Sequence, residues 1–203
     1  MDNIPQRNRY TARMFIRRLI IAVAGLLALW MLWVIVLPDA NRLPSSVTTS
    51  SDTWRVGEHT VRALQPFTLQ ARVLRRENYY FDRGAKLSPT DLALGWGPMA
   101  DPQVLQHISI SQRNRWYFWR AEHMPIERRQ IEIHSANMHL IPANAAVAKT
   151  LAQLKADQQI QLSGQLVSVE GDDGYRWVSS LTREDIGEGA CELIWVEQLV
   201  VLP

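Results

Sequence analysis

Cysteine is almost missing from this sequence: its 203 residues include one, Cys191. A single cysteine excludes a disulfide within the chain. In an oxidising compartment the remaining states are a buried thiol, a reactive thiol or a disulfide to another chain. Burial is the expected state, because free cysteine behaves as a small hydrophobic residue. No histidine or lysine lies near Cys191 in the sequence, so the sequence gives no indication of a thiolate nucleophile.

An excess of positive charge is also missing outside the N-terminus. The formal net charge is +2, but five of the 22 basic residues and one of the 20 acidic residues precede residue 19. The remaining 17 basic and 19 acidic residues give the rest of the chain a formal charge of about −2. A nucleic-acid footprint needs a basic patch in the domain itself, so no nucleic-acid partner is expected.

One long hydrophobic run is present. Residues 19–37 are 19 uncharged residues, mostly apolar, and a helix of this length spans roughly 28 Å, close to the ~30 Å hydrocarbon core of a bilayer. A signal peptide is the alternative, but its apolar region is usually ~7–15 residues long and precedes a small-x-small cleavage site. The residues from Val34 to Leu37 are bulky. We therefore expect an uncleaved transmembrane helix over residues 19–37.

The charges around this run predict its orientation. Five arginines precede it, whereas Asp39 and Arg42 nearly cancel after it. The positive-inside rule then keeps residues 1–18 in the cytoplasm and places the C-terminal domain outside. In a Gram-negative bacterium this is a single-pass inner-membrane protein with a periplasmic domain. Residues 38–53 are rich in Ser and Thr, which predicts a flexible linker before an extracytoplasmic domain over 54–203.

The pattern after residue 54 predicts a mainly β domain. Alternating or aromatic-rich stretches predict strands at 67–81, 116–120, 131–141, 160–171, 175–181 and 191–202. On the first of them, Phe67, Leu69, Ala71 and Val73 would share one face.

Helix signals are fewer than strand signals. A short helix is expected over 144–155, with Asn144 as N-cap and Val147, Leu151 and Leu154 on one apolar face. Ser88 followed by Pro89 is also typical of a helix start.

The order strand, strand, strand, helix, strand, strand is that of the OB-fold, a small Greek-key β-barrel. The segment ADQQIQLSGQLVSVEG (156–171) resembles the fourth strand of many OB domains, where a polar turn leads into an apolar–x–Gly–x–apolar run. A slip in its alternation at Leu166–Val167 indicates a bulge or a bend. The resemblance covers residues 67–201, and residues 83–130 exceed what a minimal barrel needs.

The whole chain also resembles a family of bacterial single-pass membrane-anchored proteins with an OB-like extracytoplasmic domain. Segments like GWGPMAD and NMHLIPA carry this resemblance. It implies the anchored architecture and no particular activity.

Polar residues cluster in the expected strand 131–141. Ser135, Asn137 and His139 would share one face and His134 the other, so a metal ion shared by the two histidines is not expected. Residues two apart on a strand are ~6.5–7 Å apart, too far for direct proton transfer unless the side chains lean together. The alternative is a set of polar side chains that satisfy loop backbone at the end of the barrel.

The connection 179–192 is a second candidate. It carries Arg183, Asp185 and Glu188 together with two glycines, which suits a binding loop. The spacing of a calcium loop is absent. The alternative is an acidic hairpin loop in which Arg183 pairs with a carboxylate.

Aromatic residues form the third candidate. The turn GWGPMADP (95–102) would present Trp96, and the strand RWYFWR (115–120) would place Trp116 and Trp119 on opposite faces. Mixtures of aromatic residues and arginine suit stacking on sugars or on a partner protein. The alternative is that these are core aromatics of a small barrel.

These observations predict a membrane-anchored extracytoplasmic module that binds an envelope protein partner. No catalytic residue, metal or cofactor is assigned. The candidate binding residues are Trp96, Trp116, Trp119, Ser135, Asn137, His139, Arg183, Asp185 and Glu188. A glycan- or peptide-binding module is the alternative and requires a concave groove lined by Trp and Arg. A cell-wall hydrolase comes third and requires His134 or His139 within hydrogen-bond reach of an acidic or hydroxyl group from 179–192.

Overall fold

The computed structural model describes residues 52–184 and 190–203. The chain divides into two units, Met1–Ala40 and Asn41–Pro203, and every described residue belongs to the second. The predicted tail, the predicted transmembrane helix and the predicted linker up to residue 51 lie outside the described residues. Among the residues that are described, none of the helices combines the length and the hydrophobicity that a membrane crossing needs.

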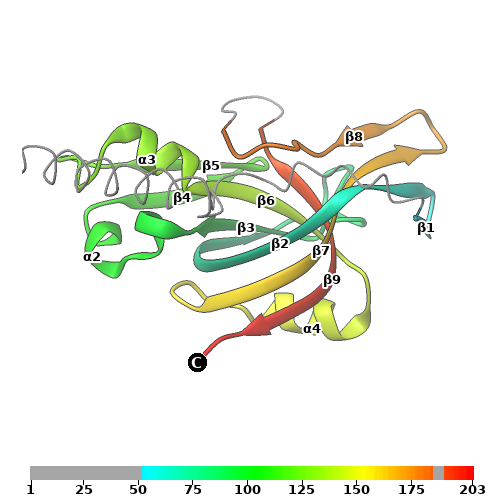
Figure 1. Cartoon of the computed structure of the whole chain (residues 1–203). Coiled ribbons are helices and arrows are strands. Elements are labelled where there is room, and N and C mark those ends of the chain that lie inside the picture. The colour runs from blue at the N-terminus through cyan, green and yellow to red at the C-terminus, as the bar shows by residue number, and fades with distance from the viewer. Residues whose placement is uncertain (1–51, 185–189) are drawn as a thin grey trace, which may run out of the picture. The chain divides into compact units, whose positions relative to one another are not determined.

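The described part is mainly β, as the sequence predicts, with a large sheet and few helices (Figure 1). Its strands are β1 (Thr53–Val56), β2 (His59–Asn78), β3 (Thr90–Gly95), β4 (Ser109–Arg113), β5 (Trp116–Arg120), β6 (Ser135–Pro142), β7 (Gln159–Gly171), β8 (Arg176–Val178) and β9 (Glu192–Val201). Its helices are η1 (Gly97–Ala100), α2 (Pro102–Leu105), α3 (Arg128–Ile133) and α4 (Ala145–Gln153).

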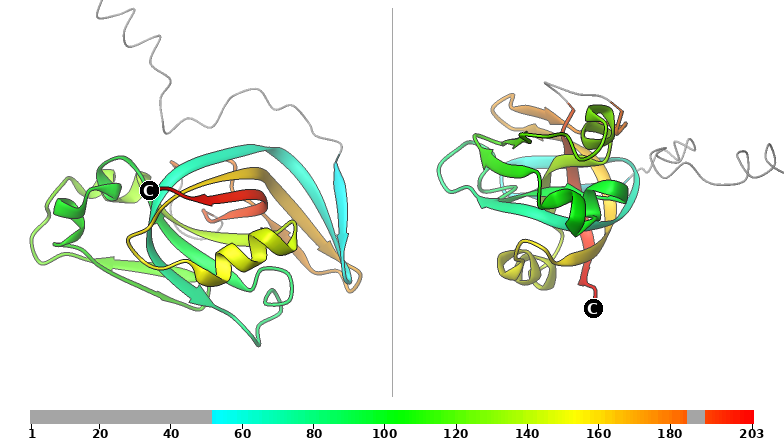
Figure 2. Two further views of the ribbon diagram at one scale, coloured as in Figure 1. Left: turned by 90° about the horizontal axis from the view of Figure 1, so that it is seen from below. Right: turned by 90° about the vertical axis from the view of Figure 1, so that its left-hand side faces the viewer.

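Five strands form a closed ring. The long strand β2 pairs with β3 and, on its other edge, with β7. Strand β3 pairs with β6, β6 pairs in parallel with β9, and β9 returns to β7. The strands curve around a shared interior (Figure 2). Closure leaves no free edge within the ring, and β1 and β8 extend the sheet beyond it.

The interior of the ring holds the main core. As predicted, Phe67, Leu69, Ala71 and Val73 lie on one face of β2, and all four are buried in this core. They pack with apolar residues from each of the other four strands of the ring. Alternation along a strand therefore places one side of every ring strand in a common interior.

The predicted slip near Leu166–Val167 is found in the pairing of β2 with β7. The register shifts between Ala63 and Gln65, which pair with Val167 and Leu166. The extra residue, Leu64, is on β2 rather than on β7. Leu166 is buried in the main core and Val167 in a second core cluster, so both faces of β7 are buried at this point. A second shift occurs between Val73 and Arg75, where β2 passes from β7 to β3.

Helix α4 confirms the predicted helix at 144–155. Asn144 is its N-cap, and its side chain accepts a hydrogen bond of 3.0 Å from the amide of Val147. Val147, Leu151 and Leu154 are buried against the core of the ring. The helix ends with Leu154 as C-cap, after which the chain turns into β7.

Replacement of Asn144 by Ala should destabilise the domain by about 1 kcal/mol, because the amide of Val147 loses its capping acceptor. Asn144→Asp keeps an acceptor at the same position and should cost clearly less. The midpoint of urea unfolding of the full-length protein measures both changes. Equal losses in the two variants would contradict this role for the cap.

Two predicted elements are wrong. Residues 131–133 complete helix α3 instead of starting a strand, because Ile131 packs with Met99 and Ile108 in a third core cluster. Tertiary packing here overrides the β preference of isoleucine. The predicted helix start at Ser88 and Pro89 is also wrong, since β3 begins directly after it and is buried along its whole length.

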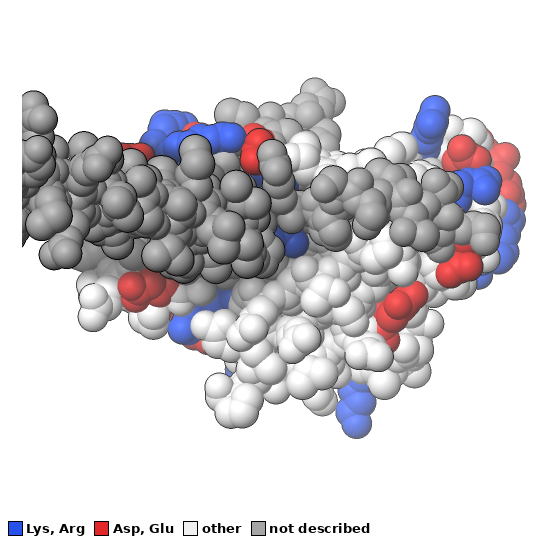
Figure 3. All heavy atoms as spheres, in the orientation of Figure 1, with Lys and Arg blue, Asp and Glu red and all other residues white. Residues whose placement is uncertain are grey.

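Charged residues of both signs are mixed at the end of the sheet formed by β1 and the adjoining ends of β2 and β7 (Figure 3). Arg55 pairs there with Asp172, and Arg83 pairs with Asp173. All four side chains are more than half exposed, so each pair contributes little to stability.

Candidate functional site

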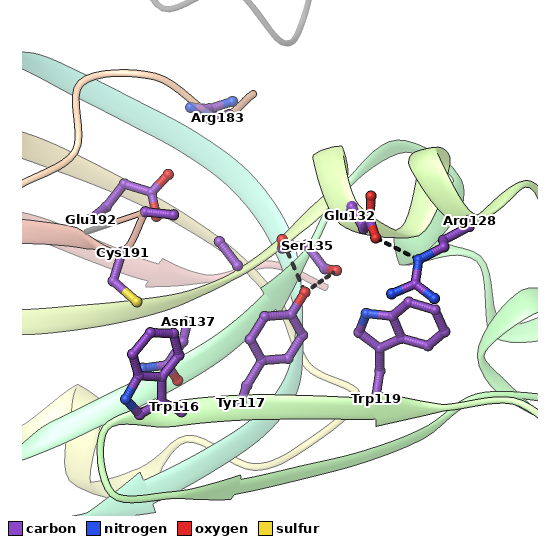
Figure 4. A pocket seen from close by; sticks show the side chains of 12 residues that line it. Trp116, Tyr117, Trp119, Arg128, Glu132, Ser135, Asn137, Arg183, Cys191 and Glu192 are labelled. Carbon is purple, nitrogen blue, oxygen red and sulfur yellow. Dashed lines mark hydrogen bonds and ion pairs between the residues drawn. The ribbon is translucent and has the colours of Figure 1, made fainter. Parts of the chain in front are cut away.

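A cavity of about 280 Å³ opens between β5, α3, β6 and the segment that leads into β9. Three aromatic side chains rise from β5 on one side of it, and Arg183, Cys191 and Glu192 lie across from them (Figure 4). The lining residues are Trp116, Tyr117, Trp119, Arg128, Glu132, Ser135, Ala136, Asn137, Arg183, Ala190, Cys191 and Glu192. Segments far apart in the sequence thus meet at one concave site.

A tight hairpin supplies the aromatic wall. Strands β4 and β5 are joined by Asn114 and Arg115, which have φ angles of 52° and 69°. Two central residues with positive φ define a type I′ turn, the connection whose twist suits a hairpin. Asn is common in such a turn, but Arg is not, so the surroundings must hold Arg115 in place.

Two ion pairs hold Arg115, and the one with Asp91 is buried. Its guanidinium donates two hydrogen bonds to Asp82, of 3.1 and 2.8 Å, and one each of 2.8 Å to Asp91 and to the carbonyl of Ser88. The Arg115 side chain is 16% exposed and that of Asp91 is fully buried. The guanidinium also lies 3.9 Å from the ring centre of Tyr79. The hairpin is therefore fixed to β3 by charge.

Polar side chains on β6 complete this anchorage and form the floor of the cavity. Asn137 donates to Asp91 (3.2 Å) and accepts from Gln112 on β4 (2.6 Å). The hydroxyls of Tyr117 and Ser135 lie 2.9 Å apart, and Ser135 also donates to the carbonyl of Ile131 (2.6 Å). Burial raises the pKa of the Tyr117 hydroxyl, so this group stays neutral and able to donate.

Arg183 closes the opposite side of the cavity. Its side chain is largely buried, and its guanidinium lies 5.0 Å from the ring centre of Phe67 and 5.2 Å from that of Trp96. Burial lowers the pKa of Arg183, and the nearby charge of Glu192 opposes this effect. Glu192 is itself fully buried. Arg183 therefore contacts aromatic residues of the ring's core and also lines the cavity.

The structure corrects the placement of Trp96. The turn does not present this residue to solvent: it is 5% exposed and belongs to the core of the ring. Its neighbour Met99 is fully buried as well. The short helix η1 folds this turn back onto β3, so the core interpretation of Trp96 is the correct one.

The other predicted residues divide into three groups. Trp116, Trp119, Ser135, Asn137 and Arg183 line the cavity, so the two tryptophans share one site. His139 lies on the same strand as Ser135 and Asn137 but lines a second, neighbouring cavity. Asp185 and Glu188 lie outside the described residues.

His139 has an acidic neighbour. Its Nδ1 lies 2.9 Å from Oδ2 of Asp91, at hydrogen-bond distance but without hydrogen-bond geometry, so the contact is electrostatic. The hydrolase hypothesis requires an acidic or hydroxyl group from 179–192, whereas this carboxylate comes from β3. His134 caps the end of α3, and its Nδ1 lies 2.9 Å from the carbonyl of Gln130. The two histidines therefore belong to different surroundings.

Sequence reasoning did not single out Asp91, Tyr117 or Cys191 as site residues, and it included Glu192 only as the last residue of the candidate connection 179–192. Asp91 lies in a segment that looks like the start of a helix, and Cys191 and Glu192 reach the site only through the pairing of β6 with β9. A usable signal was Asn114–Arg115 between two strand-like stretches, since Asn favours the positive φ of a hairpin turn.

The lining offers stacking surfaces, hydrogen-bonding groups and two charges of each sign. Within the described ranges, no group of three or more His, Cys, Asp or Glu side chains is arranged to hold a metal ion. Comparison with known proteins finds no protein family and no curated protein that matches the chain. The arrangement suits non-covalent binding of a ligand that has both apolar and polar groups.

Proposed function

We propose that this chain is a single-pass membrane-anchored protein whose extracytoplasmic domain binds a peptide segment of an envelope protein partner in the cavity beside β5. The anchor rests on the apolar run 19–37 and on the five arginines before it. The binding role rests on the residues that line the cavity.

The domain itself we propose to be an OB-like Greek-key barrel. The ring order β2–β3–β6–β9–β7 and the return to β2 support this, as does the parallel pairing of β6 with β9. Helix α4 lies between the third and fourth strands of the ring, the position that the sequence pattern predicts. The hairpin β4–β5 and helix α3 are then an insertion between the second and third barrel strands.

The position of the cavity supports a binding role. OB-folds bind their ligands on the face of the second and third strands and beside the connections between strands one and two and strands four and five. Here Ser135, Ala136 and Asn137 come from the third ring strand, and Arg183 and Cys191 come from the connection between the fourth and fifth. This likeness to OB-folds is one of position and carries no ligand identity.

The observation that carries the proposal is the chemistry of the lining. Trp116 and Trp119 provide flat apolar surface, while Asn137 and the Tyr117–Ser135 pair provide polar groups at the floor. Tryptophan, tyrosine and arginine are the residues that contribute most binding energy in protein interfaces. A peptide segment offers matching apolar side chains and backbone amides.

The test is site-specific photo-crosslinking of the full-length protein in native membranes. A benzophenone amino acid at position 116 should capture one partner protein, whereas the same group at position 118 should not. Phe118 is the matched control, because it lies on the same strand and is 41% exposed against 40% for Trp116, but it does not line the cavity.

A matching pair of alanine variants gives the size of the effect. Trp116→Ala should weaken partner capture roughly tenfold or more, and Phe118→Ala should leave it within twofold. Equal capture from positions 116 and 118, or equal losses in the two alanine variants, would overturn the peptide-binding proposal.

A glycan is the second candidate ligand, because the site is concave and is lined by tryptophan, arginine and asparagine. Titration with soluble cell-wall fragments, followed by quenching of tryptophan fluorescence, separates the two candidates. Saturable quenching that Trp119→Ala removes, without a protein crosslink at position 116, would favour the glycan.

A further inference from the structure

A second cavity of about 480 Å³ lies beside the first and shares Trp116 and Cys191 with it. Its other lining residues are Asp82, Arg83, Gly84, Arg115, His139, Tyr175, Trp177 and Val178. The only cysteine of the chain and a buried histidine therefore line the same space. Neither sequence position nor local spacing brings these two residues together.

Strand pairing explains why they meet. Strands β6 and β9 are parallel, and His139 pairs with Leu193. Cys191 lies two residues before Leu193, directly before β9 begins at Glu192. The pairing of β9 with β6 therefore brings Cys191 close to the strand that carries His139, and both residues line the cavity.

The histidine is held in a defined orientation. It is 3% exposed, its ring packs 4.7 Å from that of Trp177, and its Nδ1 faces Asp91 at 2.9 Å. Asp91 is fixed in turn by Arg115 and Asn137. A proton on Nδ1 would face this carboxylate and leave Nε2 as the basic nitrogen.

We propose that Cys191 is a nucleophile that accepts an acyl group in this cavity, with His139 as its general base and Asp91 as the residue that orients the histidine ring. Cysteine paired with a histidine, which a third group orients, is the arrangement that activates a thiol toward carbonyl carbon. The ligand class is an ester or amide of a carboxylic acid. This inference does not depend on the peptide-binding proposal.

The proposed acyl transfer needs only Cys191, His139 and the ligand. The Cys191 thiol gives its proton to His139 Nε2, and its sulfur forms a bond to the carbonyl carbon of the ligand. The bond from that carbon to the leaving oxygen or nitrogen breaks, and the leaving group takes the proton from His139. A thioester on Cys191 results, and water or an amine then receives the acyl group by the reverse sequence.

Charged groups from several elements face this pair. Arg115, Asp82 and Arg83 come from the hairpin turn and from the loop before β3, and Asp91 comes from β3. Tyr175 lies beside Arg83, whose guanidinium is 4.6 Å from its ring centre. Glu192 follows Cys191 directly and is buried. The arginines favour a thiolate and the carboxylates oppose it.

The first test measures alkylation of the full-length protein by iodoacetamide as a function of pH. Because Cys191 is the only cysteine, the rate of cysteine alkylation reports on this thiol alone. At pH 6.5 the wild-type protein should react roughly tenfold faster than His139→Gln, since a neighbouring histidine lowers a thiol's pKa. His107→Gln is the matched control, because His107 is exposed and lies outside the cavity, and its rate should equal that of wild type.

A second measurement covers the case in which His139→Gln does not fold. The ultraviolet absorbance of the thiolate is measured at pH 6.5 as the difference between wild type and Cys191→Ser, which differ by one atom. Wild type should show a thiolate signal, because a neighbouring histidine lowers a thiol's pKa. The absence of thiolate absorbance at this pH would overturn the pairing of the two residues.

The third test addresses the acyl step. With 4-nitrophenyl acetate, wild-type protein should release a burst of one equivalent of nitrophenol and carry one acetyl group on Cys191 by mass spectrometry. Cys191→Ser should show neither. An ordinary thiol with a pKa near 8.5, or a fast thiol that forms no acetyl adduct, would overturn the proposal. Neither result changes the crosslinking test at position 116.

Discussion

Arg115→Ala is expected to lower the free energy of unfolding by about 3–5 kcal/mol, the cost of removing one partner from a buried ion pair. Asp91 is fully buried and would keep only the amide of Asn137 and the ring of His139 as polar neighbours. The hairpin β4–β5 would also lose its link to Asp82 and its packing on Tyr79. Denaturant unfolding of the full-length protein, followed by tryptophan fluorescence, measures the loss.

Arg113→Ala is the matched control for this variant. Arg113 lies on the same hairpin and is exposed, and its guanidinium stacks 4.8 Å from the ring centre of Phe118. Its removal should cost well under 1 kcal/mol, roughly the value of an exposed cation–π contact. The double variant Arg115→Ala with Asp91→Ala should be little worse than either single variant, because the two residues are coupled. Similar losses for Arg113→Ala and Arg115→Ala would show that the buried pair does not hold the hairpin.

Gly164→Ala is expected to cost about 3 kcal/mol or more, because the added methyl group has no room. A Cβ atom at this position would overlap the carbonyl oxygen of Trp195 and lie 3.0 Å from its carbonyl carbon. Both are backbone atoms of β9 and cannot rotate away. Gly164 pairs with Phe67 on β2 and with Val196 on β9, so relief of the clash must open the ring.

Gly57→Ala is the control that separates the cost of a steric clash from the cost of placing alanine at a positive φ. Nothing lies within 4 Å of the position that a Cβ on Gly57 would take, but its φ of +56° is unfavourable for alanine. The expected cost is about 1–2 kcal/mol. The denaturant midpoints of unfolding of the two variants measure both costs. A Gly164→Ala protein as stable as Gly57→Ala would contradict the close approach of β7 and β9.

Much of the fold is predictable from local patterns. The alternation of Phe67, Leu69, Ala71 and Val73 correctly indicates the core face of β2. Asn144 and the apolar spacing after it correctly indicate α4. Both signals are local, because side-chain periodicity and end capping depend on residues within one or two turns of each other.

The exposure of individual residues is much less predictable. Trp96 has the flanking glycines of an exposed turn, yet the helix η1 returns it to the core. Ile131 and Ile133 have a strand-like pattern, yet both lie in helix α3, whose Ile131 packs with Met99 and Ile108. In both places a contact between distant segments outweighs a local preference worth a fraction of a kcal/mol.

By itself, the sequence determined the mainly β character, the position of the single well-capped helix and the core face of the long strand. It also indicated five of the residues that line the cavity, Trp116, Trp119, Ser135, Asn137 and Arg183, because unusual residue types stand out in any context. Only the tertiary structure decided that Trp116, Asn137 and Arg183 share one cavity and that Cys191 lines a second cavity together with His139. The physical reason is that strand pairing and ion pairs such as Arg115–Asp91 join residues separated by many positions. No local pattern in the chain records which distant strand becomes a neighbour.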